Sequence, residues 1–144
     1  MPTLQFEPID PIKLPLVKRF YKQHYASTKP KRDELMIGAY GNQGLCGIVR
    51  FRIVAQYRLL TGMAVESTQR GTGIGHALLH YCQAHILQQH DYCFAYAHLT
   101  EFYRKANFIP IAAETLPAEL QTLFKRYSSS GKDLIPMQFI PEIC

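Results

Sequence analysis

The 144-residue sequence contains no tryptophan, and its apolar runs stay far below the ~20 residues that a membrane-spanning helix needs. Its first ten residues hold no basic segment followed by an apolar core, so we expect no secretory signal peptide. The four cysteines form no C-x-x-C pair and no metal-type spacing; they are Cys46, Cys82, Cys93 and Cys144. This pattern is typical of reduced thiols, and we expect a cytoplasmic protein without membrane contact or bound metal.

Charged residues are also modest in number. With 47% apolar and 19% charged residues, the composition is that of an ordinary folded domain and excludes an intrinsically disordered chain. The length is typical of one domain, and it is enough to bury roughly two-thirds of the unfolded chain's surface. We therefore expect a single domain spanning residues 1–144.

The net charge of +5 is unevenly distributed, because residues 13–32 contain seven cations and no acid. These cations are Lys13, Lys18, Arg19, Lys22, Lys29, Lys31 and Arg32. Such a run is most often a solvated face of the protein. An acidic partner, or attraction of a negatively charged cofactor, remains an alternative interpretation.

The most informative stretch joins an apolar run at 59–65, a loop at 66–75 with three glycines, and an amphipathic pattern that begins at Ile74 and predicts a helix ending near Gln89. A strand followed by a glycine-rich turn and a helix is typical of an anion site. The glycines let a ligand approach the backbone, and the first N–H groups of the helix point at it. The helix dipole favours a phosphate there, and Arg70 adds a charge that can pair with phosphate in a forked geometry.

Two common phosphate-binding motifs are excluded. A dinucleotide fingerprint G-x-G-x-x-G beginning at Gly71 requires glycine at position 76, where the sequence has His76. A P-loop requires Gly-Lys-Ser/Thr after a four-residue gap, and the chain has no such run.

The other elements predict an α+β (mixed α/β) fold with a mostly antiparallel central sheet and flanking helices. Strands at 34–40 and 45–55 flank turn residues 41–44 and predict a hairpin, with Val49, Phe51 and Ile53 on one face of the second strand and Arg50 and Arg52 on the other. A strand at 92–97 follows the helix after the glycine loop, which predicts a parallel pair. Further strands are expected at 3–9, 108–111 and 134–140, and a loop at 26–33. Further helices are expected from Pro11 or Pro15, at 98–107 and at 117–127.

Two motifs resemble one known family. Residues 70–75, Arg-Gly-Thr-Gly-Ile-Gly, match the Gln/Arg-x-x-Gly-x-Gly/Ala acetyl-CoA motif of the GNAT superfamily of N-acetyltransferases. Residues 102–108, Phe-Tyr-Arg-Lys-Ala-Asn-Phe, resemble the superfamily's Phe-Tyr-x-Lys-x-Gly-Phe signature. Asn107 replaces the usual glycine, and asparagine is the next best residue for a left-handed helix cap. Ser67 stands where many relatives carry proline.

The resemblance implies an acetyl-CoA-dependent N-acetyltransferase in which a primary amine of a small molecule or protein attacks the thioester directly. It implies that the pyrophosphate lies on Arg70, Gly71, Thr72, Gly73, Ile74 and Gly75, and the pantetheine along the backbone of Met63, Ala64 and Val65. It further implies that Tyr103 protonates the thiolate leaving group, which a phenol of pKa ~10 can do at neutral pH.

The general base is left open among Glu66, Glu101, His98 and a water chain. His76 and His80 are four residues apart on one helical face, but a zinc protease pattern requires Glu at position 77, where Ala77 stands. No metal is expected.

One alternative belongs to another functional class: a non-catalytic acyl-CoA-binding or nucleic-acid-binding module that uses the basic N-terminal helix. Helix packing explains the nearby aromatics Phe20, Tyr21 and Tyr25 better, so a nucleic-acid partner is not expected. The acceptor cannot be read from the sequence, although the basic surface disfavours cationic polyamines and aminoglycosides. A homodimer is common in the superfamily, but no sequence feature marks one here.

Overall fold

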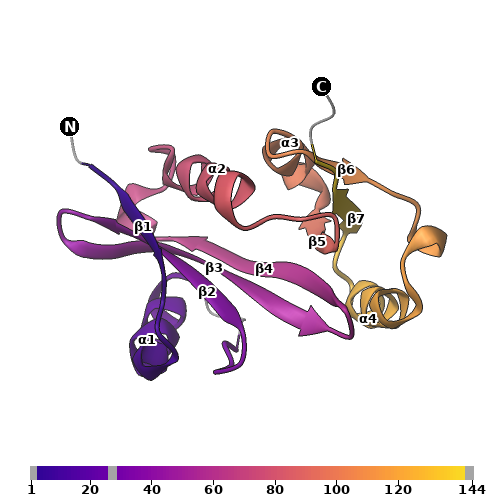
Figure 1. Cartoon of the computed structure of the whole chain (residues 1–144), viewed down its shortest axis with the longest axis horizontal. Coiled ribbons are helices and arrows are strands. Elements are labelled where there is room, and N and C mark those ends of the chain that lie inside the picture. Colours follow the sequence, from indigo (N-terminus) through magenta and orange to yellow (C-terminus); the bar gives the residue numbers. More distant parts are fainter. Residues whose placement is uncertain (1–2, 26–28, 142–144) are drawn as a thin grey trace. The chain divides into compact units, whose positions relative to one another are not determined.

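The computed structural model describes residues 3–25 and 29–141 (Figure 1). The predicted loop at 26–33 falls partly outside these residues, and Cys144 wholly so. The chain forms two compact units, one built from the residues up to Arg52 and from Thr61–Cys82, the other from Ile53–Leu60 and the residues from Gln83 onward. Within the described ranges, no helix has both the length and the apolar character needed to cross a membrane.

The strands of the first unit are β1 (Gln5–Pro8), β2 (Leu35–Gly41), most of β3 (Gly44–Val54) and the second half of β4 (Tyr57–Val65). β2 pairs antiparallel with both β1 and β3. Gly41 pairs with Gly44, and Gly44 has a φ of +100°, which places the predicted turn residues at the tip of the hairpin. The predicted hairpin is confirmed.

Two helices cover opposite faces of these strands (Figure 1). α1 (Leu14–His24) follows a 3₁₀ turn, η1 (Pro11–Lys13), whose start is capped because the Asp10 carboxylate accepts the Ile12 N–H at 3.0 Å. α1 buries an apolar stripe against β2, β3 and β4; the cluster contains Ile9, Val17, Phe20, Tyr21, Met36, Ile48 and Ala64. α2 (Ile74–His85) packs on the other face.

Because α1 and α2 cover both faces of these strands, the environment of β3 differs from the one that its alternating sequence pattern predicts. The alternation was predicted in the correct phase, because Val49 and Phe51 are fully buried on one face. However, α1 covers the opposite face, so Arg50 is only 3% exposed and pairs with Glu34. Ile53, on the same face near the end of the strand, is 62% exposed.

The second unit contains the first half of β4 together with β5 (Asp91–Tyr96), β6 (Phe108–Pro110) and β7 (Leu134–Phe139). β5 runs parallel to β4, as predicted, and antiparallel to β7, which also pairs antiparallel with β6. The strand order is therefore β1-β2-β3-β4-β5-β7-β6, a mostly antiparallel seven-stranded sheet. The predicted fold class is confirmed.

The helices of the second unit are α3 (Thr100–Arg104) and α4 (Ala118–Ser129), with short 3₁₀ turns η3 (Ala97–Leu99) and η4 (Ala113–Thr115) before them. Every third or fourth residue of α4 is apolar, and this stripe packs on β4 and β5. The resulting core consists of Leu59, Tyr92, Leu116, Leu120 and Leu123.

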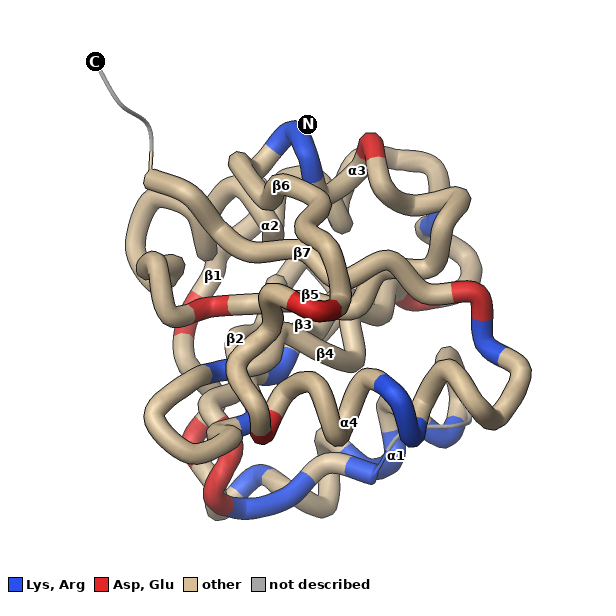
Figure 2. Tube along the Cα trace, turned by 90° about the vertical axis from the view of Figure 1, so that its right-hand side faces the viewer, with Lys and Arg blue, Asp and Glu red and all other residues tan. Residues whose placement is uncertain are grey.

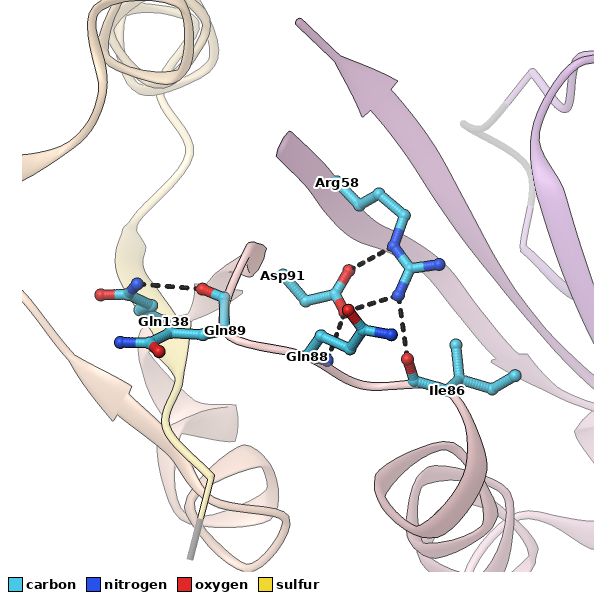
Figure 3. Close-up of polar contacts among 6 residues, drawn as sticks. All are labelled: Arg58, Ile86, Gln88, Gln89, Asp91 and Gln138. Atoms are coloured by element: carbon cyan, nitrogen blue, oxygen red, sulfur yellow. Dashed lines mark hydrogen bonds and ion pairs between the residues drawn. The ribbon is translucent and has the colours of Figure 1, made fainter. Parts of the chain in front are cut away.

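A buried ion pair fixes the start of β5 (Figure 3). The Arg58 guanidinium donates to both carboxylate oxygens of Asp91 at 2.7 Å and to the Ile86 carbonyl at 3.0 Å. The Asp91 carboxylate, whose residue is completely buried, also accepts the Gln88 N–H at 2.8 Å. These bonds turn the chain after α2, which ends at His85 rather than near Gln89 as predicted.

Candidate functional site

The residues predicted to hold a phosphate lie together between β4 and α2. The Glu66 N–H donates to the Cys46 carbonyl at 2.9 Å, and this bond to β3 marks the end of β4. A single 3₁₀ turn, η2 (Ser67–Gln69), follows, and α2 begins at Ile74. The strand, loop and helix predicted from the sequence are therefore present in that order.

Two glycines shape the loop. Gly71 has a φ of +82° and Gly73 a φ of +93°, values that side chains other than glycine adopt only with strain. A Cβ atom built on either residue would meet nothing within 4 Å. The glycines are needed for the backbone conformation, and the space beside them is open to a ligand.

The first turn of α2 offers backbone donors beside that space. The Ala77 N–H donates to the Gly73 carbonyl at 3.0 Å, so the helical ladder begins at Gly73. The N–H groups of Ile74 and Gly75 belong to the first turn, where a helix supplies no acceptor of its own. Together with the helix dipole, these donors suit a diphosphate.

Arg70 supplies a positive charge to the loop and also anchors it by hydrogen bonds. Its Nε donates to the Val65 carbonyl at 3.3 Å, and its Nη2 donates to the carbonyl of His24, the last residue of α1. A guanidinium has five donor N–H groups, so these two bonds leave donors for a phosphate. The predicted phosphate contact of Arg70 stays a prediction.

A buried polar cluster supports β4 from the face covered by α1. Gly62 has a φ of +64°, and the Tyr21 hydroxyl donates to the Gly62 carbonyl at 2.7 Å. The Arg50 guanidinium lies 5.2 Å from the centre of the Tyr21 ring and donates to Glu34. The cluster orients the backbone immediately before Met63, where the predicted pantetheine segment begins.

Tyr103, the predicted acid, lies in the second unit on α3. It is 7% exposed, and its ring meets those of Phe102 and Phe108 edge-on, with centroids 5.0 and 6.0 Å away. Asn107, which ends this segment, has a φ of +70°, so the predicted left-handed conformation is confirmed. The loop after α3 therefore turns as the second motif requires.

The three candidate bases occupy different settings. Glu66 lies in the first unit, where its carboxylate accepts the Thr68 hydroxyl at 3.0 Å and the Gln69 amide at 2.8 Å. In the second unit, Glu101 is largely exposed and pairs with Arg104 at 3.2 Å. The ring of His98 stacks on Tyr96 with centroids 5.9 Å apart. These contacts leave the choice of base open.

Sequence reasoning missed the residues that brace the site. His24 contacts Ser67 from 43 positions away, and Tyr21 contacts Gly62 from 41 positions away, so no local pattern marks either pair. One signal was available: a glycine inside the apolar run at 59–65 is typical of a strand irregularity or a close approach of another group.

Known proteins share this fold. The family model described as "Acetyltransferase (GNAT) domain" matches residues 32–110, which include the glycine loop and Tyr103. A search of curated proteins found no match.

Several solved structures superpose over nearly the whole chain. The ribosomal-protein-S18-alanine N-acetyltransferase from Escherichia coli has a TM-score of 0.67 at 12% identity, covering 99% of this chain and 96% of its own. A histone acetyltransferase HPA2 and related acetyltransferase from Corynebacterium glutamicum has a TM-score of 0.67 at 15% identity, covering 99% and 98%. Rv2747 from Mycobacterium tuberculosis, solved in complex with CoA, has a TM-score of 0.67 at 17% identity, covering 94% and 98%.

These similarities to solved structures establish the fold, and the family match extends over more than half of the chain. The chain belongs to the GNAT family of N-acetyltransferases, enzymes whose co-substrate is acetyl-CoA.

Proposed function

We propose that this enzyme moves an acetyl group from acetyl-CoA to a primary amine of a small molecule or protein, by direct attack of the amine. The observation that carries the proposal is the open, left-handed glycine loop at the start of α2, formed by Gly71 and Gly73. Arg70 and the backbone from Gly71 to Gly75 hold the pyrophosphate. The backbone of Met63, Ala64 and Val65 holds the pantetheine.

Acetyl-CoA supplies the acetyl group as a thioester. The amine nitrogen forms a bond to the carbonyl carbon, the carbon–sulfur bond breaks, and the sulfur leaves with the bonding electrons. The Tyr103 hydroxyl gives its proton to that sulfur. The amine loses its own proton to Glu66, Glu101, His98 or water, because an alkyl ammonium of pKa about 10 cannot attack.

The surface of α1 bears on the acceptor. Lys18, Arg19 and Lys22 are exposed there, and Figure 2 shows basic residues along this helix. Their field repels cations within roughly one Debye length, about 8 Å at physiological salt. We propose an acceptor that is neutral or acidic around its amine, rather than a polyamine or an aminoglycoside.

The first test is binding followed by turnover. Acetyl-CoA at 100 times its dissociation constant should add about 2.7 kcal/mol to the free energy of unfolding, visible as a raised melting temperature. Acetyl transfer should then appear with at least one amine from a panel containing acidic, neutral and cationic acceptors. A protein that neither binds acetyl-CoA nor turns it over would contradict the proposal.

Tyr103→Phe tests the acid. It should lower kcat about 10²- to 10⁴-fold, the usual contribution of a positioned acid, while the Kd for acetyl-CoA stays within about twofold. Tyr92→Phe is the matched control, because Tyr92 is 6% exposed, similar to Tyr103, and lies in the same unit. Equal activity in the two variants would remove Tyr103 from the mechanism.

A further inference from the structure

The end of α1 is fastened to the glycine loop by three hydrogen bonds within the first unit. His24 Nδ1 lies 3.1 Å from the backbone nitrogen of Ser67 and 2.7 Å from its hydroxyl oxygen. The His24 carbonyl accepts from Arg70. These contacts involve both the side chain and the backbone of His24, and both ends of the segment 67–70.

The bonding pattern determines the form of the imidazole. A backbone N–H can only donate, so Nδ1 of His24 must accept from Ser67 N–H and carries no proton. The Ser67 hydroxyl then donates to the same nitrogen. The histidine in this arrangement is therefore neutral, with its proton on Nε2.

The ring of His24 is itself held in place. Its centroid lies 4.7 Å from that of Phe20, which is 6% exposed and belongs to the core cluster under α1. The imidazole is thus oriented by the packed interior. This gives the loop a fixed acceptor on a regular element rather than on another loop.

The acceptor is placed where the loop needs one. η2 begins at Ser67, and Glu66 before it provides no side-chain cap for the turn. His24 supplies that missing acceptor from outside. The turn continues into the glycine loop, because the Gln69 carbonyl accepts the Thr72 hydroxyl at 2.6 Å.

We propose that His24 is a positioning residue for acetyl-CoA: through Ser67 it holds the loop 66–75 in its binding conformation before the cofactor arrives. The inference rests on the proposed function of that loop. His24 is not assigned any contact with the cofactor or the reacting atoms. Preorganisation of this kind raises affinity by removing the ordering cost from the binding step.

Three variants separate this role from a merely structural one. His24→Ala removes the acceptor. His24→Asn keeps one, because the asparagine Oδ1 can take the place of Nδ1. In the third variant, His24→Ala is combined with Ser67→Pro, so that the fixed φ of proline replaces the lost hydrogen bond. Proline suits this position because Ser67 is the first residue of its turn. The residue before it, Glu66, has φ −49° and ψ 131°, the extended backbone that is required before proline. Gln23→Ala, an exposed neighbour, is the control.

The measurements are the Kd for acetyl-CoA by calorimetry, kcat, the melting temperature, and amide hydrogen exchange at residues 68–73 without ligand. His24→Ala should raise the Kd about five- to tenfold and speed exchange in the loop, with kcat at saturation unchanged within twofold. His24→Asn and the double variant should both return to within about twofold of the wild-type Kd.

Unchanged Kd and exchange in His24→Ala would overturn the inference while leaving the proposed function intact. The inference would also be overturned if His24→Ala bound acetyl-CoA more weakly and neither His24→Asn nor the double variant restored the Kd, while the melting temperature of His24→Ala lay well below that of Gln23→Ala. If the wild-type protein itself fails to bind acetyl-CoA, the proposed function of the loop fails, and the positioning role fails with it.

Discussion

Gly62 shows how one residue can couple the backbone of β4 to the buried cluster beneath it. Its φ of +64° is already unfavourable for other residues, and a Cβ there would lie 2.8 Å from Arg50 Nε and 2.9 Å from the Tyr21 hydroxyl. Neither side chain can move away freely. Tyr21 donates to the carbonyl of Gly62 itself, and the buried Arg50 pairs with the buried Glu34.

Gly62→Ala should therefore destabilise the protein by more than the backbone strain of a positive φ would alone. Gly44→Ala is the matched control, because Gly44 also has a positive φ but a Cβ there would meet nothing within 4 Å. We expect a loss of about 1–3 kcal/mol in the control and a further ~1–3 kcal/mol for Gly62→Ala from overpacking. Urea unfolding measures both; equal losses would show that the cluster yields without cost.

Cys93 links the stability of the protein to alkaline pH. Complete burial raises the pKa of this thiol, so the folded protein keeps the proton. The unfolded chain releases it above about pH 8.5. The stability that the buried, protonated thiol contributes is thus fully present below about pH 8.5. As pH rises further, the free energy of unfolding falls by about 1.4 kcal/mol per pH unit for each such thiol.

Urea unfolding between pH 7.5 and 10 should show this decline. Burial also raises the pKa of Cys46, and that of Tyr21 against the opposing charge of Arg50, so the wild-type slope has several sources. Cys93→Ala should be less stable at neutral pH but lose stability less steeply above pH 8.5. Parallel curves for the two proteins would contradict the assignment to Cys93.

At the scale of elements, the junction of α2, β4 and β5 depends on Arg58 and Asp91 (Figure 3). Arg58→Met would leave the carboxylate of a fully buried Asp91 without its cation, which costs about 3–5 kcal/mol in comparable buried pairs. Arg104→Met is the control, because the Arg104–Glu101 pair is exposed and worth at most about 1 kcal/mol. Similar losses in the two variants would mean that Asp91 finds another partner.

The same junction shows the limit of element prediction from sequence. The amphipathic pattern that begins at Ile74 correctly predicted a helix after the glycine loop, and Ile74, Leu78 and Cys82 are buried in it. It could not predict where the helix ends, because the groups that turn the chain include Arg58, 28 positions before Ile86. The two strands around the turn at Gly41–Gly44 were predicted closely, since their turn chemistry is local.

At the scale of the whole chain, the sequence predicts those features that short motifs and periodicity encode. The glycine loop and the left-handed Asn107 follow from neighbouring residues, and the parallel pair of β4 and β5 follows from the single helix that connects them. The burial of Arg50 could not be predicted, because it depends on α1 covering a face that alternation alone leaves to solvent. The bracing of the loop by His24 likewise joins positions 43 residues apart.

Backbone amide chemical shifts during an acetyl-CoA titration of the ¹⁵N-labelled protein would locate the cofactor on the chain residue by residue. The largest changes should fall on Gly71, Gly73, Ile74 and Gly75, with smaller ones along Met63–Val65, because phosphates accept hydrogen bonds from the first N–H groups of α2. Gly73→Val should abolish these changes. Saturable binding whose shifts leave residues 70–75 unaffected would contradict the assignment of this loop.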